Sequence, residues 1–283
     1  MPFAQLEHYC PPVIMAVLDA GEAILGIYES GEDVEVEYKA DQSPLTAADR
    51  ASHALLMERL QQLWDLPVLS EESREVPWER RGQWESYWLV DPLDGTKEFI
   101  RRNGEFTVNV ALVRRGVPVY GVVYAPVPGL LYFGAAGHGA RRAVRGVDYA
   151  DRDELAARLT DAEHAFPALP LAQEPGRPFT VVASRSHGNV ETTDFIERLE
   201  VDHGPARRVS VGSSLKLCLC AEGTADVYPR LAPTMHWDTA AAQAVVSAAG
   251  GRVLQAGTSD ELSYGGPSLV NPYFVVTRPG FRI

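Results

Sequence analysis

Hydrophobic residues recur at helical spacing in two stretches of the N-terminal part of the chain. The first follows a Pro-Pro pair and ends before Gly31, which predicts a helix over about residues 11–29. The second begins at Thr46 and ends before Pro67, so a second helix is expected there. In the second helix, the apolar side is marked by Leu55, Leu56, Leu60 and Leu63.

Shorter apolar runs rich in β-branched and aromatic residues predict strands. They cover residues 68–70, 87–90, 106–113, 119–124, 179–183 and 274–276. Further helices are expected over residues 190–199, 213–221 and 239–249. The turn at 114–118 joins two of the strands as an antiparallel hairpin, while other strands alternate with helices. The pattern predicts a layered α+β architecture rather than a purely parallel sheet.

The length of 283 residues fits one large domain or two closely packed halves. Residues 141–178 change in character, with a run of charges followed by several prolines and no clean periodicity. We take this stretch as the transition between halves and divide the chain into an N-terminal α+β subdomain, 1–150, and a C-terminal α/β subdomain, 151–283.

The chain is acidic, with 26 Lys and Arg against 38 Asp and Glu and a formal net charge of −12. This balance excludes binding to a nucleic acid polymer or an anionic lipid surface through bulk charge. A small substrate that carries phosphate remains compatible. Such a substrate requires local cations, either clustered Lys and Arg or a metal held by the protein's own carboxylates.

Cysteine usage and the N-terminal residues bear on the compartment. An odd count of three, Cys10, Cys218 and Cys220, fits neither a disulfide framework nor a zinc site and predicts buried thiols in a reducing cytoplasm. Residues 1–9 contain Glu7 and no Lys or Arg, so they do not predict a signal peptide. No apolar run is expected to reach the ~18 residues of a membrane span.

The most informative segment is the loop that follows the strand at 87–90. Asp91 ends the apolar run, and a Pro- and Gly-containing turn returns Asp94 to its side. Two carboxylates at the end of a strand repel each other unless a cation lies between them, and Mg²⁺ prefers such oxygen ligands, to which the Leu93 carbonyl adds another. Gly95 and Thr96 offer backbone N–H groups for a phosphate oxygen.

An isolated loop of this kind is more often a simple turn whose side chains cap the backbone. Further acids at the ends of elements favour the metal interpretation. Glu71 and Glu72 follow another short strand, Asp238 precedes a helix, and Asp49 lies three residues after Thr46. Each also has an ordinary explanation, namely a solvated loop, an N-cap and a capping box.

These residues resemble the signatures of the lithium-sensitive inositol monophosphatase superfamily. The matching segments, in chain order, are Ser43–Asp49 (S-P-[VL]-T-x-A-D), Glu71–Glu72, Asp91–Thr96 (D-P-[IL]-D-G-T) and Trp237–Ala241 (W-D-x-A-A). Within the superfamily, the chain resembles the CysQ branch of 3'(2'),5'-bisphosphate nucleotidases. The features typical of that branch are Lys97–Phe99, Ser184–His187, Gly212–Lys216 and Tyr228–Arg230. Inositol monophosphatases usually carry Thr-Asn-Phe where this chain has Thr-Lys-Glu-Phe.

The resemblance implies an αβαβα fold and a Mg²⁺-dependent phosphatase site. Glu71, Asp91 and the Leu93 carbonyl would hold one Mg²⁺, and Asp91, Asp94 and Asp238 a second. A third, weaker Mg²⁺ would arrive with the substrate, with Glu72 as its candidate ligand. Thr96, hydrogen-bonded to Asp49, would orient and deprotonate the attacking water.

The resemblance also implies which residues contact the substrate. Around the reacting phosphate these are Glu71, Leu93, Asp94, Gly95, Thr96 and Asp238. Around the nucleotide and its second phosphate they are Lys216, Arg230, Ser213 as a hydroxyl donor, His187, Arg185 and, near the ribose, Glu222. The ordinary alternatives are a solubilising surface role for the basic residues and a plain loop position for His187.

The function implied is hydrolysis of the 3'-phosphate of 3'-phosphoadenosine 5'-phosphate, or of its sulfated form, to AMP and phosphate in sulfur assimilation. Two alternatives stay open: an inositol 1-phosphatase or other sugar phosphatase of the same fold, and a non-catalytic regulatory protein. The resemblance further leaves open a monomer or a homodimer, and a cytoplasmic enzyme that is free or peripherally bound to the inner membrane.

Overall fold

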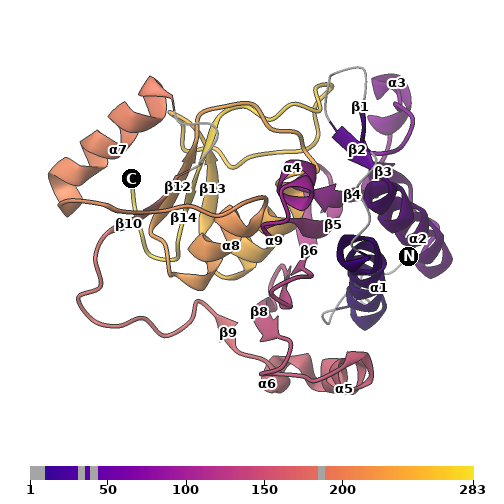
Figure 1. Ribbon diagram of the computed structural model, residues 1–283. Coiled ribbons are helices and arrows are strands. Elements are labelled where there is room, and N and C mark those ends of the chain that lie inside the picture. Colours follow the sequence, from indigo (N-terminus) through magenta and orange to yellow (C-terminus); the bar gives the residue numbers. More distant parts are fainter. Residues whose placement is uncertain (1–9, 31–35, 39–43, 184–188) are drawn as a thin grey trace.

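The computed structural model describes residues 10–30, 36–38, 44–183 and 189–283. Helices and sheets alternate in layers (Figure 1). The helices are α1 Pro11–Glu29, α2 Ala47–Leu63, α3 Trp78–Arg81, α4 Thr96–Ile100, α5 Arg152–Arg158, α6 Ala162–Ala165, α7 Val190–His203, α8 Leu215–Glu222 and α9 Ala240–Ala248, with a 3₁₀ turn at Leu159–Asp161.

The larger sheet has seven strands in the order β3-β4-β5-β6-β7-β8-β9. Its strands are β3 Val68–Ser70, β4 Ser86–Asp94, β5 Thr107–Arg114, β6 Val117–Ala125, β7 Leu130–Ala135, β8 Gly139–Val144 and β9 Ala168–Leu169. Only β3 and β4 pair in parallel; every other neighbouring pair is antiparallel. The ends of β3 and β4 therefore lie at the same edge, which brings Glu71 and Asp91 to one side of the sheet.

The smaller sheet has five strands in the order β11-β10-β12-β14-β13. These are β10 Thr180–Val182, β11 Arg207–Val209, β12 Val227–Arg230, β13 Arg252–Gln255 and β14 Phe274–Thr277, while β1 Val36–Tyr38 and β2 Pro44–Thr46 form a separate hairpin. β10 pairs in parallel with both β11 and β12, and β14 is antiparallel to its neighbours. The mixed pairing confirms the expected α+β class.

Three apolar cores lie between the layers. α1 and α2 cover one face of the larger sheet, α8 and α9 fill the space between the two sheets, and α7 covers the far face of the smaller sheet (Figure 1). The order is thus helix, sheet, helix, sheet, helix. Because α8 and α9 lie between the sheets, the loops at their N-terminal ends come close to the ends of β4 and β5.

Helix α1 has the expected bounds, and it also corrects an expectation. It is long and apolar enough to pass a test of length and composition for a membrane span, contrary to the prediction that no such run exists. Val13, Ile14, Val17 and Ile24 are fully buried on the larger sheet and α2. Half of the most apolar part of this helix is buried inside the protein. Packing on the core accounts for its apolar character.

The segment at 141–178 contains the end of β8, the short helices α5 and α6, and β9. β9 still belongs to the larger sheet, so the chain passes to the smaller sheet between Leu169 and Thr180. The division at residue 150 stays a prediction. All three cysteines are buried and free, as expected from their number and spacing.

Candidate active site

The loop with Asp91 and Asp94 ends strand β4, and its shape is fixed by local contacts. The register of β4 on β5 shifts between these two residues, so that Asp91 faces Asn109 and Asp94 faces Thr107. The Leu93 N–H donates to Asp91 Oδ1 at 3.0 Å, and Ser52 Oγ of α2 donates to the Pro92 carbonyl at 2.7 Å. The two carboxylates are therefore held at one end of the sheet by backbone and side-chain contacts.

Asp49 connects helix α2 to this loop. Its Oδ2 accepts hydrogen bonds from the Thr46 N–H and Thr46 Oγ1 at 2.7 and 2.6 Å, so the expected capping box is present. Its Oδ1 accepts from Thr96 Oγ1 at 3.2 Å, which confirms the predicted contact. Asp49 can cap α2 and also bind Thr96, because the two oxygens of a carboxylate accept several hydrogen bonds.

Gly95 makes the turn from β4 into α4. Its φ of +93° is a conformation that residues with a side chain rarely adopt. The turn makes Thr96 the first residue of α4, and its hydroxyl then points back to Asp49. The backbone thus favours glycine between Asp94 and Thr96.

The carboxylates of the site repel one another. Burial raises the pKa of Asp91 well above its usual range, and repulsion from Glu71, Asp94, Asp238 and Asp49 adds to the effect. Burial also raises the pKa of Asp94, to about 6, although Lys216 counteracts the shift. For Asp238, burial and repulsion from Asp94 and Glu71 raise the pKa well above its usual range. A cation among these oxygens would relieve the repulsion.

The donor set fits Mg²⁺ by its chemistry, since it consists of carboxylates and a turn carbonyl. Among the residues that the structure describes, no three acidic, His or Cys side chains already converge as a ready-made metal cluster. The acids nevertheless act strongly on one another's pKa, which requires them to be close. The arrangement is a group of neighbouring acids whose charge a divalent cation would offset.

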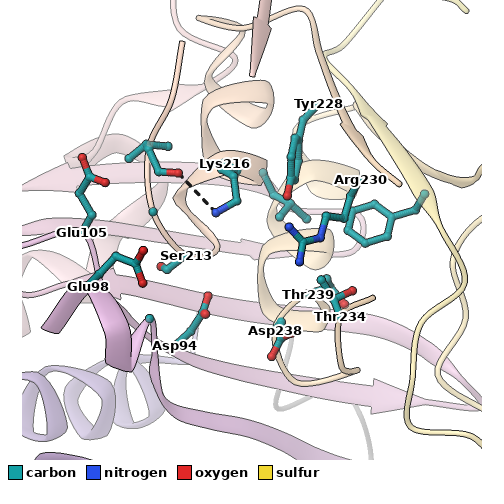
Figure 2. A pocket seen from close by; sticks show the side chains of 15 residues that line it. Asp94, Glu98, Glu105, Ser213, Lys216, Tyr228, Arg230, Thr234, Asp238 and Thr239 are labelled. Carbon is teal, nitrogen blue, oxygen red and sulfur yellow. Dashed lines mark hydrogen bonds between the residues drawn. The ribbon is translucent and has the colours of Figure 1, made fainter. Parts of the chain in front are cut away.

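A pocket of about 150 Å³ opens beside these acids, and elements of both sheets line it. Figure 2 shows Asp94, Glu98 and Glu105 on one side and Lys216 and Arg230 on the other. The Lys216 ammonium donates to the Val211 carbonyl at 3.3 Å, and Arg230 donates to the Pro233 carbonyl at 2.9 Å. Burial lowers the pKa of Lys216, while Asp94, Glu98 and Glu105 act against that shift.

The structure brings most of the predicted residues together. Those that line the pocket are Asp94, Gly95, Ser213, Lys216, Arg230 and Asp238. Thr96, Asp91 and Asp49 are joined to them through the loop and the contacts described above. Asp238 is not the N-cap of α9: that position belongs to Thr239, and Asp238 Oδ2 accepts from the Met235 N–H at 2.8 Å.

The expectation for Glu222 was wrong. It lies at the other end of α8 from Lys216, where its carboxylate accepts from Tyr132 and from Arg142, both at 2.9 Å. It links the larger sheet to α8 and does not line the pocket. Arg185, His187 and Ser43 lie outside the described residues.

Sequence reasoning missed several residues that line the pocket. Glu98 and Glu105 are acids beside the Gly-Thr turn, and Glu98 had served only as a marker of the branch. Thr107 and Asn109 do not line the pocket, but sequence reasoning also missed them as buried polar residues within an apolar strand. The sequence does contain a signal for these two residues, because polar residues at alternate positions of a buried strand lie on the same face of the sheet.

The sequence is similar to known proteins of one family. The family model described as "Inositol monophosphatase family" matches residues 6–277. The chain is 44% identical to the 3'(2'),5'-bisphosphate nucleotidase CysQ of Escherichia coli strain K12, over 94% of this chain and 95% of that protein. It is 45% identical to CysQ of Salmonella typhimurium, over 92% and 95% of the two chains.

Solved structures give the same result. The crystal structure of CysQ from Bacteroides thetaiotaomicron matches with a TM-score of 0.84 and 47% identity, over 94% of this chain and 96% of that one. The suhB protein of Bartonella henselae shares the fold, with a TM-score of 0.68 at 22% identity, over 94% and 92%. The chain belongs to the inositol monophosphatase family.

Proposed function

We propose that this protein is a Mg²⁺-dependent phosphomonoesterase that removes the 3'-phosphate of 3'-phosphoadenosine 5'-phosphate, giving AMP and phosphate. The sulfated form of this nucleotide is a further candidate substrate, and recycling in sulfur assimilation is the corresponding role. The main support for this proposal is the 44% identity to a 3'(2'),5'-bisphosphate nucleotidase over nearly the whole of both chains. Members of this family are metal-dependent phosphatases, generally with Mg²⁺. We place the enzyme in the cytoplasm.

We assign the metal ligands to the acids whose burial, with repulsion from neighbouring acids, raises their pKa values, Asp91, Asp94 and Asp238, together with Glu71 and the Leu93 carbonyl. When bound, Mg²⁺ stabilises the negative charge that builds up on the attacking and leaving oxygens during phosphoryl transfer. The protein's part is to hold these oxygens at one end of the larger sheet. Ser52, which donates to Pro92, and the Leu93 N–H, which donates to Asp91, keep the loop in place.

Thr96 and Asp49 form the proton-accepting pair of the proposal. The Thr96 hydroxyl donates to Asp49, so its oxygen lone pairs are left to accept a hydrogen bond from the attacking water. As water loses a proton to Thr96 Oγ1, the Thr96 proton passes to Asp49. Burial raises the pKa of Asp49, which makes its carboxylate a better proton acceptor than an exposed aspartate.

We assign Lys216 and Arg230 to the binding of the second phosphate, the 5'-phosphate. They are the cations among the residues that line the pocket, and they lie across it from Glu98 and Glu105 (Figure 2). A 5'-phosphate between Lys216 and Arg230 would offset both charges.

The proposal is tested by phosphate release from the bisphosphate nucleotide and from inositol 1-phosphate, each with Mg²⁺ and with EDTA. We expect Mg²⁺-dependent, Li⁺-inhibited release and a clear preference for the nucleotide. A preference for inositol 1-phosphate would overturn the substrate assignment. Activity that persists in EDTA would overturn the metal assignment.

The second phosphate has its own test, which uses 3'-AMP as a substrate without the 5'-phosphate. We expect the unaltered enzyme to favour the bisphosphate by about tenfold or more in kcat/KM, since each charged contact contributes about 1.5–3 kcal/mol. Lys216→Met should remove most of that preference. Because the Lys216 charge also opposes the rise in the pKa of Asp94, we expect a smaller loss on 3'-AMP as well. Arg208→Met, in which an exposed arginine outside the pocket is replaced, is the matched control. An equal loss on both substrates would contradict the assignment of Lys216.

A further inference from the structure

The loop before helix α9 is closed by two hydrogen bonds between Met235 and Asp238. The Asp238 N–H donates to the Met235 carbonyl at 3.2 Å, and the Met235 N–H donates to Asp238 Oδ2 at 2.8 Å. One carboxylate oxygen of Asp238 is therefore used inside the loop. The other, Oδ1, accepts no hydrogen bond from the part of the chain that the structure describes, so it is the oxygen left for a ligand.

Residues 269–271 run beside this loop and pair with it. The His236 N–H donates to the Leu269 carbonyl at 2.8 Å. The Asn271 N–H donates to the Thr234 carbonyl at 2.9 Å, and between these two bonds the stretches form an antiparallel bridge. The pairing brings the Asn271 side chain against the loop.

The Asn271 amide fits in only one orientation. Its Nδ2 lies 2.7 Å from the Met235 carbonyl oxygen. Because a carbonyl oxygen only accepts, the NH₂ group must face it; the turned-over amide would bring two acceptors together at the same distance. The Met235 carbonyl thus receives hydrogen bonds from both Asp238 and Asn271.

The same NH₂ group reaches the residues on both sides of 235–238. Nδ2 lies 3.1 Å from Thr234 Oγ1 and 3.0 Å from Thr239 Oγ1. Figure 2 shows Thr234, Asp238 and Thr239 together at one edge of the pocket. Asn271 therefore ties down the loop before and after Asp238.

The other atom of the amide gains nothing from this arrangement. Asn271 is buried, and its Oδ1 has no hydrogen-bond partner among the described residues. A buried carbonyl oxygen without a partner is unfavourable, and such groups are rare in folded proteins. Proteins retain local losses of this kind mainly at functional sites, so the NH₂ group of Asn271 points to a role beyond packing.

We propose that Asn271 is a positioning residue for Asp238. By holding the Met235 carbonyl and the Thr239 hydroxyl, it keeps the carboxylate turned so that Oδ1 faces the acids of the proposed Mg²⁺ site. The inference rests on the proposed function, in which Asp238 is a metal ligand. Groups that orient a metal-binding carboxylate affect metal affinity, and their loss weakens it by about 10- to 100-fold.

The test uses two variants, Asn271→Leu and Asn271→Ala. Leucine is close to asparagine in size and shape but has no N–H to donate, whereas alanine removes the amide entirely. MgCl₂ is titrated against the melting temperature without substrate and against the initial rate with saturating bisphosphate nucleotide. We expect the MgCl₂ concentration for half the effect to rise by about tenfold or more in both measurements. The value of kcat at saturating MgCl₂ should stay within about threefold, because Asp238 itself is still present.

Tyr132→Phe is the matched control. It removes a buried 2.9 Å hydrogen bond to Glu222, away from the pocket. It should lower the melting temperature but leave the MgCl₂ requirement unchanged. The inference is overturned if the Asn271 variants lose only stability, or if Tyr132→Phe raises the MgCl₂ requirement as much as they do.

A double variant shows whether Asn271 acts through Asp238. In the Asp238→Asn background, Asn271→Leu should not raise further the MgCl₂ concentration that gives half of the remaining shift in melting temperature. A further rise of about tenfold would overturn the inference and leave the nucleotidase assignment intact. If MgCl₂ changes neither the melting temperature nor the rate of the unaltered protein, the metal assignment of the proposed function fails, and the inference fails with it.

Discussion

Two buried aspartates of this protein lie in opposite electrostatic surroundings. Asp226 accepts from Arg177 Nη2 at 2.7 Å, from Arg278 Nε at 2.5 Å and from the Thr180 N–H at 2.7 Å. Asp91 has four other acids as its electrostatic neighbours. Their pKa values move in opposite directions: burial and repulsion raise that of Asp91, whereas at Asp226 the hydrogen bonds from Arg278, Thr180 and Arg177 outweigh the effect of burial and lower it.

The difference separates a carboxylate that stabilises the fold from one that serves the reaction. The protein neutralises Asp226 with its own cations and thereby ties β10, β12 and the C-terminal segment together. At Asp91 the compensating charge has to come from outside. Stability is lost by such an arrangement, and proteins retain unfavourable charge groups of this kind mainly where function requires them.

Replacement of Asp91 should have the largest effect on activity. Asp91→Asn keeps the size of the side chain but removes a charge from the centre of the proposed metal site, so we expect kcat/KM to fall by about a thousandfold, equivalent to about 4 kcal/mol. The folded state should not lose stability, because repulsion is relieved. Phosphate release and thermal unfolding in EDTA measure the two effects.

The control for this variant is Asp202→Asn, at an exposed aspartate of α7. It removes the same charge from the chain and should leave activity within twofold of the unaltered enzyme. Retained activity in Asp91→Asn would contradict the central role given to this carboxylate.

Replacement of Asp226 should produce the opposite result. Asp226→Asn leaves Arg177 and Arg278 without their shared anion, and breaking a buried ion pair by removing one partner costs about 3–5 kcal/mol. We expect this loss in the free energy of unfolding from urea titration. Activity of the folded protein at low temperature should be preserved; a large loss of kcat without loss of stability would place Asp226 in the reaction.

The contrast between local and long-range determinants also explains what the sequence predicts. Periodicity located α1 and β3 at their observed bounds, since local spacing alone defines these elements. It missed β7 and β8, where Gly134, Gly139 and the Arg141–Arg142 pair interrupt the alternation. These strands are stabilised by pairing within the sheet, which no local pattern records.

The candidate site also has a part that local sequence determines and a part that depends on long-range packing. The Asp91–Thr96 loop is contiguous, and a turn of that sequence has few other conformations, so its shape follows from its residues. The pairing of Thr107 with Ser213 joins residues more than a hundred positions apart, and only the packing of α8 against the larger sheet brings them together. Sequence reasoning named Ser213 but did not find its partner Thr107, because no local pattern connects the two residues.

Mg²⁺ itself should distinguish the group of acids around Asp91 from the ion-paired Asp226. A ligand that binds only the folded state stabilises it by about 2.7 kcal/mol at a concentration of about 100 times its Kd. We therefore expect MgCl₂ to raise the melting temperature of the unaltered protein and of Asp226→Asn. Asp91→Asn should gain little, and an equal gain in all three proteins would show that the ion acts elsewhere.

Acidification should isolate the contribution of Asp226. Because its pKa is lowered in the folded state, the stabilising effect of its charge is fully present above the unfolded-state pKa of about 3.9 and is lost as the pH falls through that value towards the folded-state pKa. Asp226→Asn cannot titrate at this position. The difference in the free energy of unfolding between the two proteins should therefore be constant near pH 6 and shrink from pH 4 downwards. A difference that stays constant to pH 3 would mean that packing, and not the charge of Asp226, holds Arg177 and Arg278 in place.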